Sequence, residues 1–215
     1  IKKNFSINST CIYNPLNRSE IISKSKIFSK KIYNKKNSLK IINIGRLVDQ
    51  KNQIVILETV KSLVQRNKIN IELILVGDGS LKKYYQNYIL NNNLTNIVKI
   101  MKFNKNPYNL IIQSDLFVLS SKFEGLPNVL LEAATLGKFI ISSDCPTGPK
   151  EILLNGKGGL LYKTNDSDDL KNKILFFVKN RSKSRQMLFN AKKNLDRFDY
   201  KKNLIKYLKI INKII

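Results

Sequence analysis

The chain has 215 residues, of which 42% are hydrophobic and 25% are charged, and both fractions are ordinary for a globular protein. Its 39 basic and 15 acidic side chains give a formal net charge of +24, and it contains two cysteines and no histidine. This composition excludes a disulfide framework, a Cys/His zinc site and any mechanism built on an imidazole base, and no apolar run approaches the ~18 residues of a membrane-spanning helix. A reducing, cytoplasmic location is the simplest expectation.

The excess of positive charge names no partner by itself. Most of the basic residues are lysines scattered among Asn and Ile, as in "NSLKIINI" and "IKYLKIINKII". A+T-rich codons produce such a composition without selection for a ligand, and this is the first interpretation. Adhesion to an anionic membrane surface is the second. Binding of nucleic acid is the third, and it would require clustered Lys and Arg with interleaved aromatic residues, whereas these charges are dispersed.

The chain opens with "IKKNFSINST", which has neither a starting Met nor the apolar core of a signal peptide, so we interpret it as a cut point. Residues 1–37 are polar, with a short strand-like "CIYN" before Pro15. They are expected to form a linker and a small helix that lead into the domain.

Residues 38–165 alternate between short apolar runs and segments with helical spacing. Short buried strands that are each followed by a helix predict an α/β fold, a Rossmann-like doubly wound parallel sheet. Ligands bind such sheets at the carboxyl ends of the strands. Strands are predicted at 40–45, 71–76, 96–103, 115–121 and 138–144, and helices at 52–67, 81–90, 106–114, 127–136 and 148–154.

Residues 166–215 are predicted to be helical throughout. "NDSDDL" contains an Asp-x-Asp (Asp166 and Asp168), but it precedes an apolar-periodic helix, so we interpret it as a helix cap and not as a metal site. The last segment is basic and amphipathic and could rest on anionic lipid. Its apolar side needs a covering surface and consists of Leu204, Tyr207, Leu208, Ile211 and Ile214.

Two loops at predicted strand ends carry residues suited to a diphosphate and a sugar. In "GRLVDQKN", Gly45 lets the backbone approach a ligand, and Arg46 and Lys51 supply two cations, although solvated cations are common in so basic a chain. In "EGLPNVLLEAATLG", Glu124 and Glu132 are eight positions apart across a Gly-Leu-Pro turn.

The second of these loops leads directly into a helix. Pro127 is expected to be its first residue, with Leu126 near the cap and Asn128 to Leu136 helical and ended by Gly137. Gly125 removes a side chain where a ligand must come close. Glu132 lies on a mostly apolar helix, so its carboxylate needs a partner, and two vicinal ribose hydroxyls would supply one.

With "VGDG" and "SDCPTGPKEIL", these motifs resemble the donor half of a retaining GT-B glycosyltransferase, and specifically glycosyltransferase family 4. The likeness runs from about Ile41 to about Leu161 with the order and spacing kept. It implies that Arg46 and Lys51 hold the donor diphosphate, that Glu132 binds the ribose and that Glu124 faces the transferred sugar. The further donor-binding residues that it implies are Gly45, Gly77, Phe103, Gly125, Leu126, Pro127 and Asn128.

The resemblance also implies a donor, an acceptor and a cellular location. The donor would be a nucleotide-sugar, expected to be a UDP-sugar, with no cofactor and no divalent metal. The acceptor would be a glycan or a polyprenyl-linked glycan held by an N-terminal domain, of which residues 1–37 would be a remnant. Residues 166–215 would pack on the donor domain, and in the family the last helix often crosses back to the other half. The isolated domain is expected to be inactive, in the cytoplasm or peripheral on the inner face of the membrane.

Three other functions stay open from the sequence. The chain could be a separate nucleotide-sugar-binding subunit that pairs with an acceptor subunit. It could be a basic nucleic-acid-binding protein of the same fold class. A sugar-nucleotide epimerase of GT-B fold is a further alternative, although the two glutamates together with "GRLVDQKN" are not its pattern.

Overall fold

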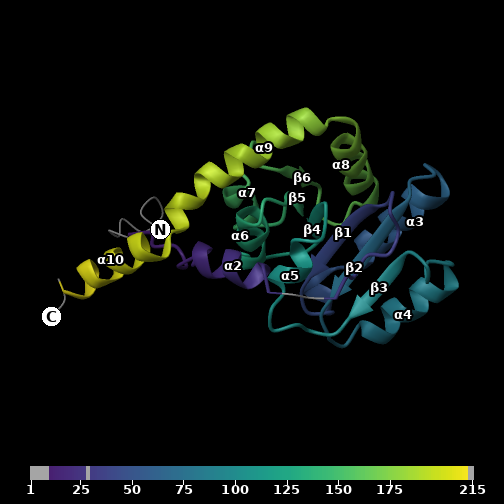
Figure 1. The fold of residues 1–215 in the computed structure, drawn as a ribbon, viewed down its shortest axis with the longest axis horizontal. Coiled ribbons are helices and arrows are strands. Elements are labelled where there is room, and N and C mark those ends of the chain that lie inside the picture. Colours follow the sequence, from purple (N-terminus) through teal and green to yellow (C-terminus); the bar gives the residue numbers. More distant parts are fainter. Residues whose placement is uncertain (1–9, 28–29, 213–215) are drawn as a thin grey trace.

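A single parallel sheet of six strands organises the chain, in the order β3-β2-β1-β4-β5-β6 (Figure 1). The computed structural model describes residues 10–27 and 30–212. All strand pairs are parallel. The predicted fold class is therefore confirmed. The strands are β1 (Leu39–Ile44), β2 (Ile71–Val76), β3 (Val98–Met101), β4 (Leu116–Leu119), β5 (Phe139–Ser143) and β6 (Leu160–Tyr162).

Helices cover both faces of the sheet, and each face has its own apolar core. Side chains from α3, α4, α8 and α9 pack on one face, and side chains from α2, α5, α6, α7 and η2 pack on the other. Gly137 ends α6 with a φ of +71°, as predicted. The helices are α2 (Arg18–Ser25), α3 (Ile54–Gln65), α4 (Lys82–Asn91), α5 (Tyr108–Ile111), α6 (Asn128–Thr135), α7 (Pro149–Ile152), α8 (Ser167–Lys179), α9 (Arg181–Asn194) and α10 (Tyr200–Ile211), with short 3₁₀ turns η1 (Asp49–Lys51) and η2 (Leu195–Phe198).

Two local predictions need correction. The strand expected before Pro15 is absent from residues 11–14, and the only sheet-like contact there is a bridge between Leu16 and Asp199. In addition, β6 was not predicted, because a three-residue apolar stretch after a glycine-rich segment is shorter than the runs from which strands are inferred. It nevertheless pairs in register with Ser142 and its neighbours on β5.

The segment before β1 is tied into the domain. Leu16, Ile21, Ile32 and Tyr33 are all buried in the core on the α6 side of the sheet. The hydroxyl of Tyr33 donates a hydrogen bond of 2.9 Å to the carbonyl oxygen of Ile41. This segment therefore contributes to the hydrophobic core of the domain.

The last helix, α10, reaches away from the body of the molecule, at the end opposite to α3 and α4 (Figure 1). It is attached chiefly through η2 and through buried Asn203, whose amide donates to the carbonyl oxygens of Arg197 and Asp199. Four of the five residues predicted to form its apolar side are exposed, and the fifth, Ile214, lies outside the described residues. The exposed four are Leu204, Tyr207, Leu208 and Ile211.

Candidate functional site

The proposed site lies where the strand order reverses, between β1 and β4. Ile41 of β1 pairs with Leu116 of β4, and Ile42 pairs with Phe117. The backbone pairing of the two strands stops there, before their carboxyl ends. Beyond that point the side chain of Asn43 bridges the two strands, because its amide nitrogen donates to the carbonyl oxygen of Val118 at 2.8 Å. A crevice at such a switch point is the usual ligand site of a doubly wound sheet.

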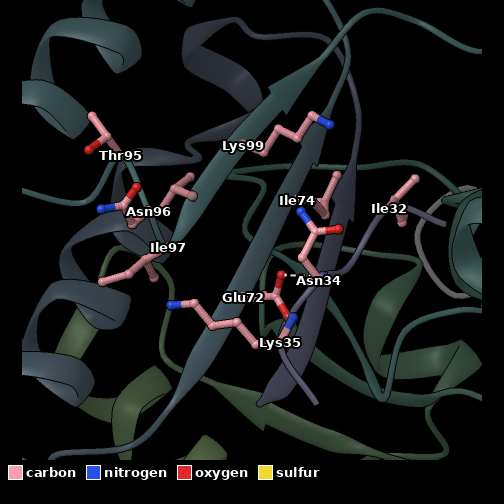
Figure 2. Close-up of a pocket in the computed structure, with 10 residues that line it drawn as sticks. Ile32, Asn34, Lys35, Glu72, Ile74, Thr95, Asn96, Ile97 and Lys99 are labelled. Atoms are coloured by element: carbon pink, nitrogen blue, oxygen red, sulfur yellow. Dashed lines mark hydrogen bonds between the residues drawn. The ribbon is translucent and has the colours of Figure 1, made fainter. Parts of the chain in front are cut away.

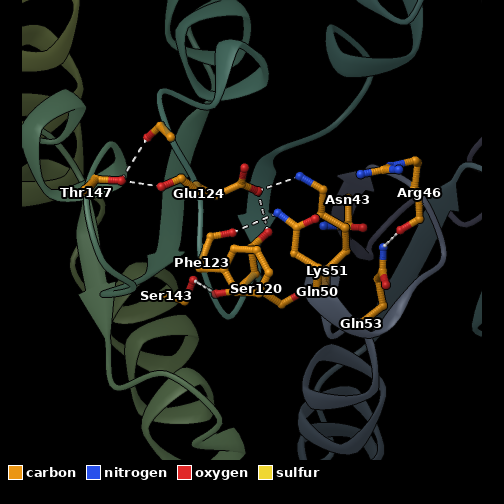
Figure 3. A network of polar contacts seen from close by, with 12 residues as sticks. Asn43, Arg46, Gln50, Lys51, Gln53, Ser120, Phe123, Glu124, Ser143 and Thr147 are labelled. Atoms are coloured by element: carbon orange, nitrogen blue, oxygen red, sulfur yellow. Dashed lines mark hydrogen bonds and ion pairs between the residues drawn. The ribbon is translucent and has the colours of Figure 1, made fainter.

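The loop after β1 is held close to the loop after β2 by backbone packing. A Cβ on Gly77 would lie 2.0 Å from the carbonyl oxygen of Gly45, so only glycine fits there. Arg46 is exposed, and its carbonyl oxygen accepts a hydrogen bond of 2.9 Å from the side chain of buried Gln53. The guanidinium of Arg46 is therefore exposed at the surface, while a hydrogen bond holds the backbone of this residue in place (Figure 3).

Lys51, from the loop after β1, and Glu124, from the loop after β4, form an ion pair of 2.6 Å (Figure 3). The side chain of Lys51 is 20% exposed and that of Glu124 only 9%, so the pair is largely withdrawn from water. The two loops are also joined through Gln50, which donates to the carbonyl oxygen of Phe123 and accepts from the backbone amide of Lys122. The structure thus brings together two predicted site residues from different loops.

Buried serines at the ends of β4 and β5 support this pair, and the sequence analysis missed them. Ser121 donates to Oε1 of Glu124 at 2.6 Å, and Ser120 donates to the carbonyl oxygen of Lys51 at 2.7 Å. Ser143 in turn donates to the carbonyl oxygen of Ser121 at 2.7 Å. The one available sequence feature was a Ser-Ser dipeptide at each of two neighbouring strand ends.

The turn between Glu124 and α6 is open on one side. A Cβ on Gly125 would have no heavy atom within 4 Å, which fits the expectation that a ligand approaches there. Leu126 is half-buried against the core, and Asn128 is the first residue of α6. Pro127 was expected to be the first helical residue but is the N-cap instead, because its ψ of 99° is extended.

A second loop closes over this turn from the end of β5. The hydroxyl of Thr147 donates to the carbonyl oxygen of Glu124 (Figure 3). Residues 144–148, together with Lys150, Glu151 and Asn155, line a cavity of about 600 Å³. Space for a ligand therefore adjoins the backbone that carries Glu124.

Glu132 lies apart from this network, on α6, where its side chain is half-buried. Burial raises the pKa of Glu132 above its usual value, and a hydrogen bond with the hydroxyl of Tyr108 opposes this rise. The predicted need for a partner is thus met in part within the chain, by a tyrosine on α5 that the sequence analysis did not single out. Within the described residues no hydrogen bond or ion pair joins Glu132 to Glu124 or to Lys51.

The remaining predicted residues have different surroundings. Phe103 follows β3 and is 73% exposed, so it is free to meet a ligand but is not part of the polar network. Glu151, in the "SDCPTGPKEIL" segment, accepts a hydrogen bond from the Tyr13 hydroxyl and lies 3.4 Å from Nη1 of Arg197. That hydrogen bond and burial raise the pKa of Tyr13 to about 12.

A separate cavity of about 450 Å³ lies at the amino end of the sheet, beside Lys99 and Asn34 (Figure 2). Its carboxylate, Glu72, accepts hydrogen bonds from the amides of Asn34 and Lys35 and from the hydroxyl of Ser38. Burial alone would raise the pKa of Glu72, but these hydrogen bonds hold it below its usual value. Its partners are thus all supplied by the segment before β1, so this carboxylate anchors that segment.

Other predictions can be checked against the same residues. Asp166 caps α8 by accepting from the amide of Asp169 at 2.9 Å, as predicted, and Asp168 pairs with Lys171. In the described part of the chain no three His, Cys, Asp or Glu side chains are grouped so as to hold a metal ion. None of the helices within residues 10–27 and 30–212 has the length and apolar character to cross a bilayer.

The chain matches the model of the family described as "Glycosyl transferases group 1" over residues 24–194. It is 32% identical over 158 residues to the UDP-Gal:alpha-D-GlcNAc-diphosphoundecaprenol alpha-1,3-galactosyltransferase of Escherichia coli, which covers 72% of this chain and 40% of that protein. It is 44% identical over 118 residues to the uncharacterized glycosyltransferase MJ1059 of Methanocaldococcus jannaschii, covering 55% and 29%. The chain thus spans less than half the length of these relatives.

Solved structures share the fold. A glycosyltransferase from Rickettsia africae ESF-5 superposes with a TM-score of 0.81 at 18% identity, covering 99% of this chain and 60% of that one. Anabaena Alr3699/HepE in complex with UDP superposes with a TM-score of 0.78 at 22% identity, covering 94% and 57%. Together with the match over residues 24–194, these likenesses show that the chain belongs to the group 1 family of glycosyltransferases and has the fold of one half of a GT-B enzyme.

Proposed function

We propose that this chain binds the nucleotide-sugar donor of a retaining glycosyltransferase in the crevice between β1 and β4. Arg46 and Lys51 hold the diphosphate, Glu132 accepts from the ribose hydroxyls, and Glu124 faces the transferred sugar. The observation that carries this proposal is the ion pair between Lys51 and Glu124, because it sets a cation and a carboxylate side by side at the switch point of the sheet. The backbone from Gly125 to Asn128 supplies further contacts, with Gly45, Gly77 and Phe103 around the rest of the donor.

The chemistry follows from the charge that leaves with the diphosphate. When the bond from the sugar to the phosphate breaks, negative charge grows on the leaving oxygen, and Arg46 and Lys51 stabilise it electrostatically. The amino end of α6 adds backbone N–H donors and a partial positive charge on the same side. The acceptor hydroxyl attacks from the face that the diphosphate leaves, so the configuration is retained, and no protein nucleophile is assigned.

We propose a UDP-sugar as donor and a polyprenyl-linked glycan as acceptor. The E. coli relative is named for UDP-Gal and for a diphosphoundecaprenol acceptor, and Anabaena Alr3699/HepE binds UDP. Since the relatives are about twice as long as the matched region or longer, we propose that the acceptor is held by a second domain, which residues 10–37 would join to the donor domain. The donor domain, residues 38–165, and the helices from 166 onward would by themselves bind donor without turnover.

Calorimetric titration of this chain with UDP, with GDP and ADP as competitors, tests the proposal. Saturable binding of UDP is expected, and it should be lost in Lys51→Ala and Glu132→Ala. Lys173→Ala is the matched control, because this lysine pairs with Asp169 on α8 and not with the site. Equal and salt-sensitive binding of all three nucleotides would instead assign the affinity to the general positive charge of the chain and contradict the proposal.

The exposed apolar face of α10 has two interpretations that a separate experiment distinguishes. It could cover a second domain, or it could rest on anionic lipid, since Lys202, Lys206 and Lys209 lie opposite to that face. Co-sedimentation of the chain with vesicles that contain anionic lipid, compared with neutral vesicles, decides between them. Binding that Leu204→Ser and Leu208→Ser abolish would favour lipid, whereas no binding, or binding that these substitutions leave unchanged and only salt abolishes, would favour a second domain as the cover of this face.

A further inference from the structure

The carboxylate of Glu124 is held by two groups on the same oxygen. Lys51 Nζ and Ser121 Oγ each lie 2.6 Å from Oε1. Among the hydrogen bonds of the described residues none reaches Oε2. The arrangement therefore leaves one carboxylate oxygen for a ligand while the other is fixed from within the protein.

Ser121 is itself rigidly placed. It is fully buried at the end of β4, and its carbonyl oxygen accepts from the hydroxyl of Ser143 on β5, which is also fully buried. A serine has a single hydroxyl proton, and here that proton is given to Glu124. The hydroxyl thus serves Glu124 from a position that two neighbouring strands determine.

This arrangement bears on a conflict within the proposed function. Lys51 is paired with Glu124, yet the donor diphosphate needs its charge. If Lys51 turns toward the phosphates, Glu124 loses its cation in a site where its side chain is only 9% exposed. A buried carboxylate without a partner would cost several kcal/mol or take up a proton. A hydroxyl that stays on Oε1 reduces that cost.

We propose that Ser121 is a positioning residue that holds Glu124 in place while Lys51 turns from this carboxylate to the diphosphate of the donor. The inference rests on the proposed function and adds an exchange of partners to it. Donor binding then moves one cation from a protein carboxylate to a phosphate, and Ser121 keeps the carboxylate aimed at the sugar. Ser143 supports the exchange through the backbone of Ser121.

The first test is calorimetric titration of Ser121→Ala with UDP. We expect affinity at least about tenfold below that of the wild-type chain, because a hydrogen bond to a charged group is lost. Ser114→Ala is the matched control: this serine is also buried and its hydroxyl also donates a hydrogen bond, but to the carbonyl oxygen of Ile111, and it lies just before the amino end of β4.

The second test removes the negative charge of Glu124, from which Lys51 must move to reach the diphosphate. Glu124→Gln is expected to bind UDP severalfold more tightly than the wild-type chain, because UDP carries no sugar for Glu124 to meet and Lys51 is released. In that background Ser121→Ala should not weaken the binding of UDP. This double-mutant cycle separates the exchange from a general loss of stability.

The outcomes distinguish this inference from the proposed function. If Ser121→Ala binds UDP as tightly as Ser114→Ala does, while Lys51→Ala abolishes binding, the exchange is overturned and the proposed donor site stands. Glu124→Gln that binds UDP more weakly than the wild-type chain would also overturn it. A wild-type chain that binds no UDP would overturn the proposed function, and this inference with it.

Discussion

Gly148 packs so closely on Gly125 that a Cβ on Gly148 would stand 1.9 Å from the carbonyl oxygen of Gly125. The same Cβ would lie 2.5 Å from Cδ of Pro127. The loop after β5 and the turn that leads into α6 are therefore in direct backbone contact, and no side chain fits between them. Gly148 also has a φ of +29°, which L-residues rarely adopt.

Gly148→Ala should consequently disturb the donor site as well as the stability of the chain. We expect a loss of about 1–3 kcal/mol in the free energy of unfolding and weaker binding of UDP, because the turn at Gly125 must move. Urea denaturation and calorimetry measure the two effects. Gly156→Ala is the control: its φ of +88° is also unfavourable, but its Cβ would meet nothing closer than 4.0 Å. Equal UDP affinity in the two variants would refute the prediction.

We expect the Glu132 carboxylate to lower the free energy of unfolding of the chain while it contributes to the binding of UDP. Burial raises its pKa in the folded chain, so the ionised carboxylate destabilises the fold at neutral pH. As pH falls through the folded pKa toward the unfolded value of about 4.3, the proton binds more tightly to the folded state and this deficit disappears.

Glu132→Gln should therefore raise the free energy of unfolding at pH 7 by on the order of 1 kcal/mol, and the gain should shrink as the pH is lowered toward 4. UDP affinity should fall in the same variant, because the amide is a poorer acceptor for ribose hydroxyls. Denaturation at several pH values and calorimetry at pH 7 test the two parts. Glu58→Gln on α3, an exposed glutamate, should change neither. A less stable Glu132→Gln at pH 7 would contradict the first part.

Tyr108→Phe should change how UDP binding responds to acid. The Tyr108 hydroxyl lowers the pKa of Glu132 against the larger effect of burial, so its removal raises that pKa further. The carboxylate then takes up a proton at higher pH, and UDP affinity should begin to fall at a higher pH than in the wild-type chain. Titrations between pH 5.5 and 8 measure this shift. Tyr88→Phe on α4 is the control, and parallel profiles for Tyr108→Phe and the wild-type chain would show that the hydroxyl has no such role.

Removal of residues 200–215 should leave the domain folded. Within this segment the described residues are mostly exposed, and the main loss is Asn203, whose amide makes two hydrogen bonds to the preceding turn. We expect the free energy of unfolding to fall by no more than about 2 kcal/mol. Truncation after Asn180 is the contrasting case, since it removes the buried Met187, Leu195 and Phe198 and should abolish cooperative unfolding. An unfolded chain after the shorter truncation would contradict this prediction.

The bounds of an element were predicted best where all of its residues are buried. Every residue of β2 is buried, and the predicted and observed bounds of that strand coincide. By contrast, β6 is too short to stand out, and Pro127 was misplaced by one position because a cap depends on a single ψ angle. The fold class followed from periodicity, which many residues determine together.

The candidate site was less predictable than the fold. The positions of Arg46, Lys51, Glu124 and Glu132 came from motifs, and their roles remain predictions. The pairing of Lys51 with Glu124 joins residues 73 positions apart, and nothing in local sequence specifies it. The hydroxyl of Ser121 was equally hidden, because serine at the end of a strand is common and becomes informative only when its partner is known.

Arg197 contacts residues that are synthesised long before it. It contacts Tyr13, 184 positions earlier, and Glu151, beside the cavity that adjoins Glu124. At a rate of synthesis of 5–20 residues per second, the contact between Arg197 and Tyr13 can form only on the order of ten to forty seconds after Tyr13 has been synthesised. All six strands are synthesised before then, so the contact between Arg197 and Glu151 is among the last to form. A ribosome that stalls before Arg197 would therefore hold a nascent chain in which neither Tyr13 nor Glu151 has this partner.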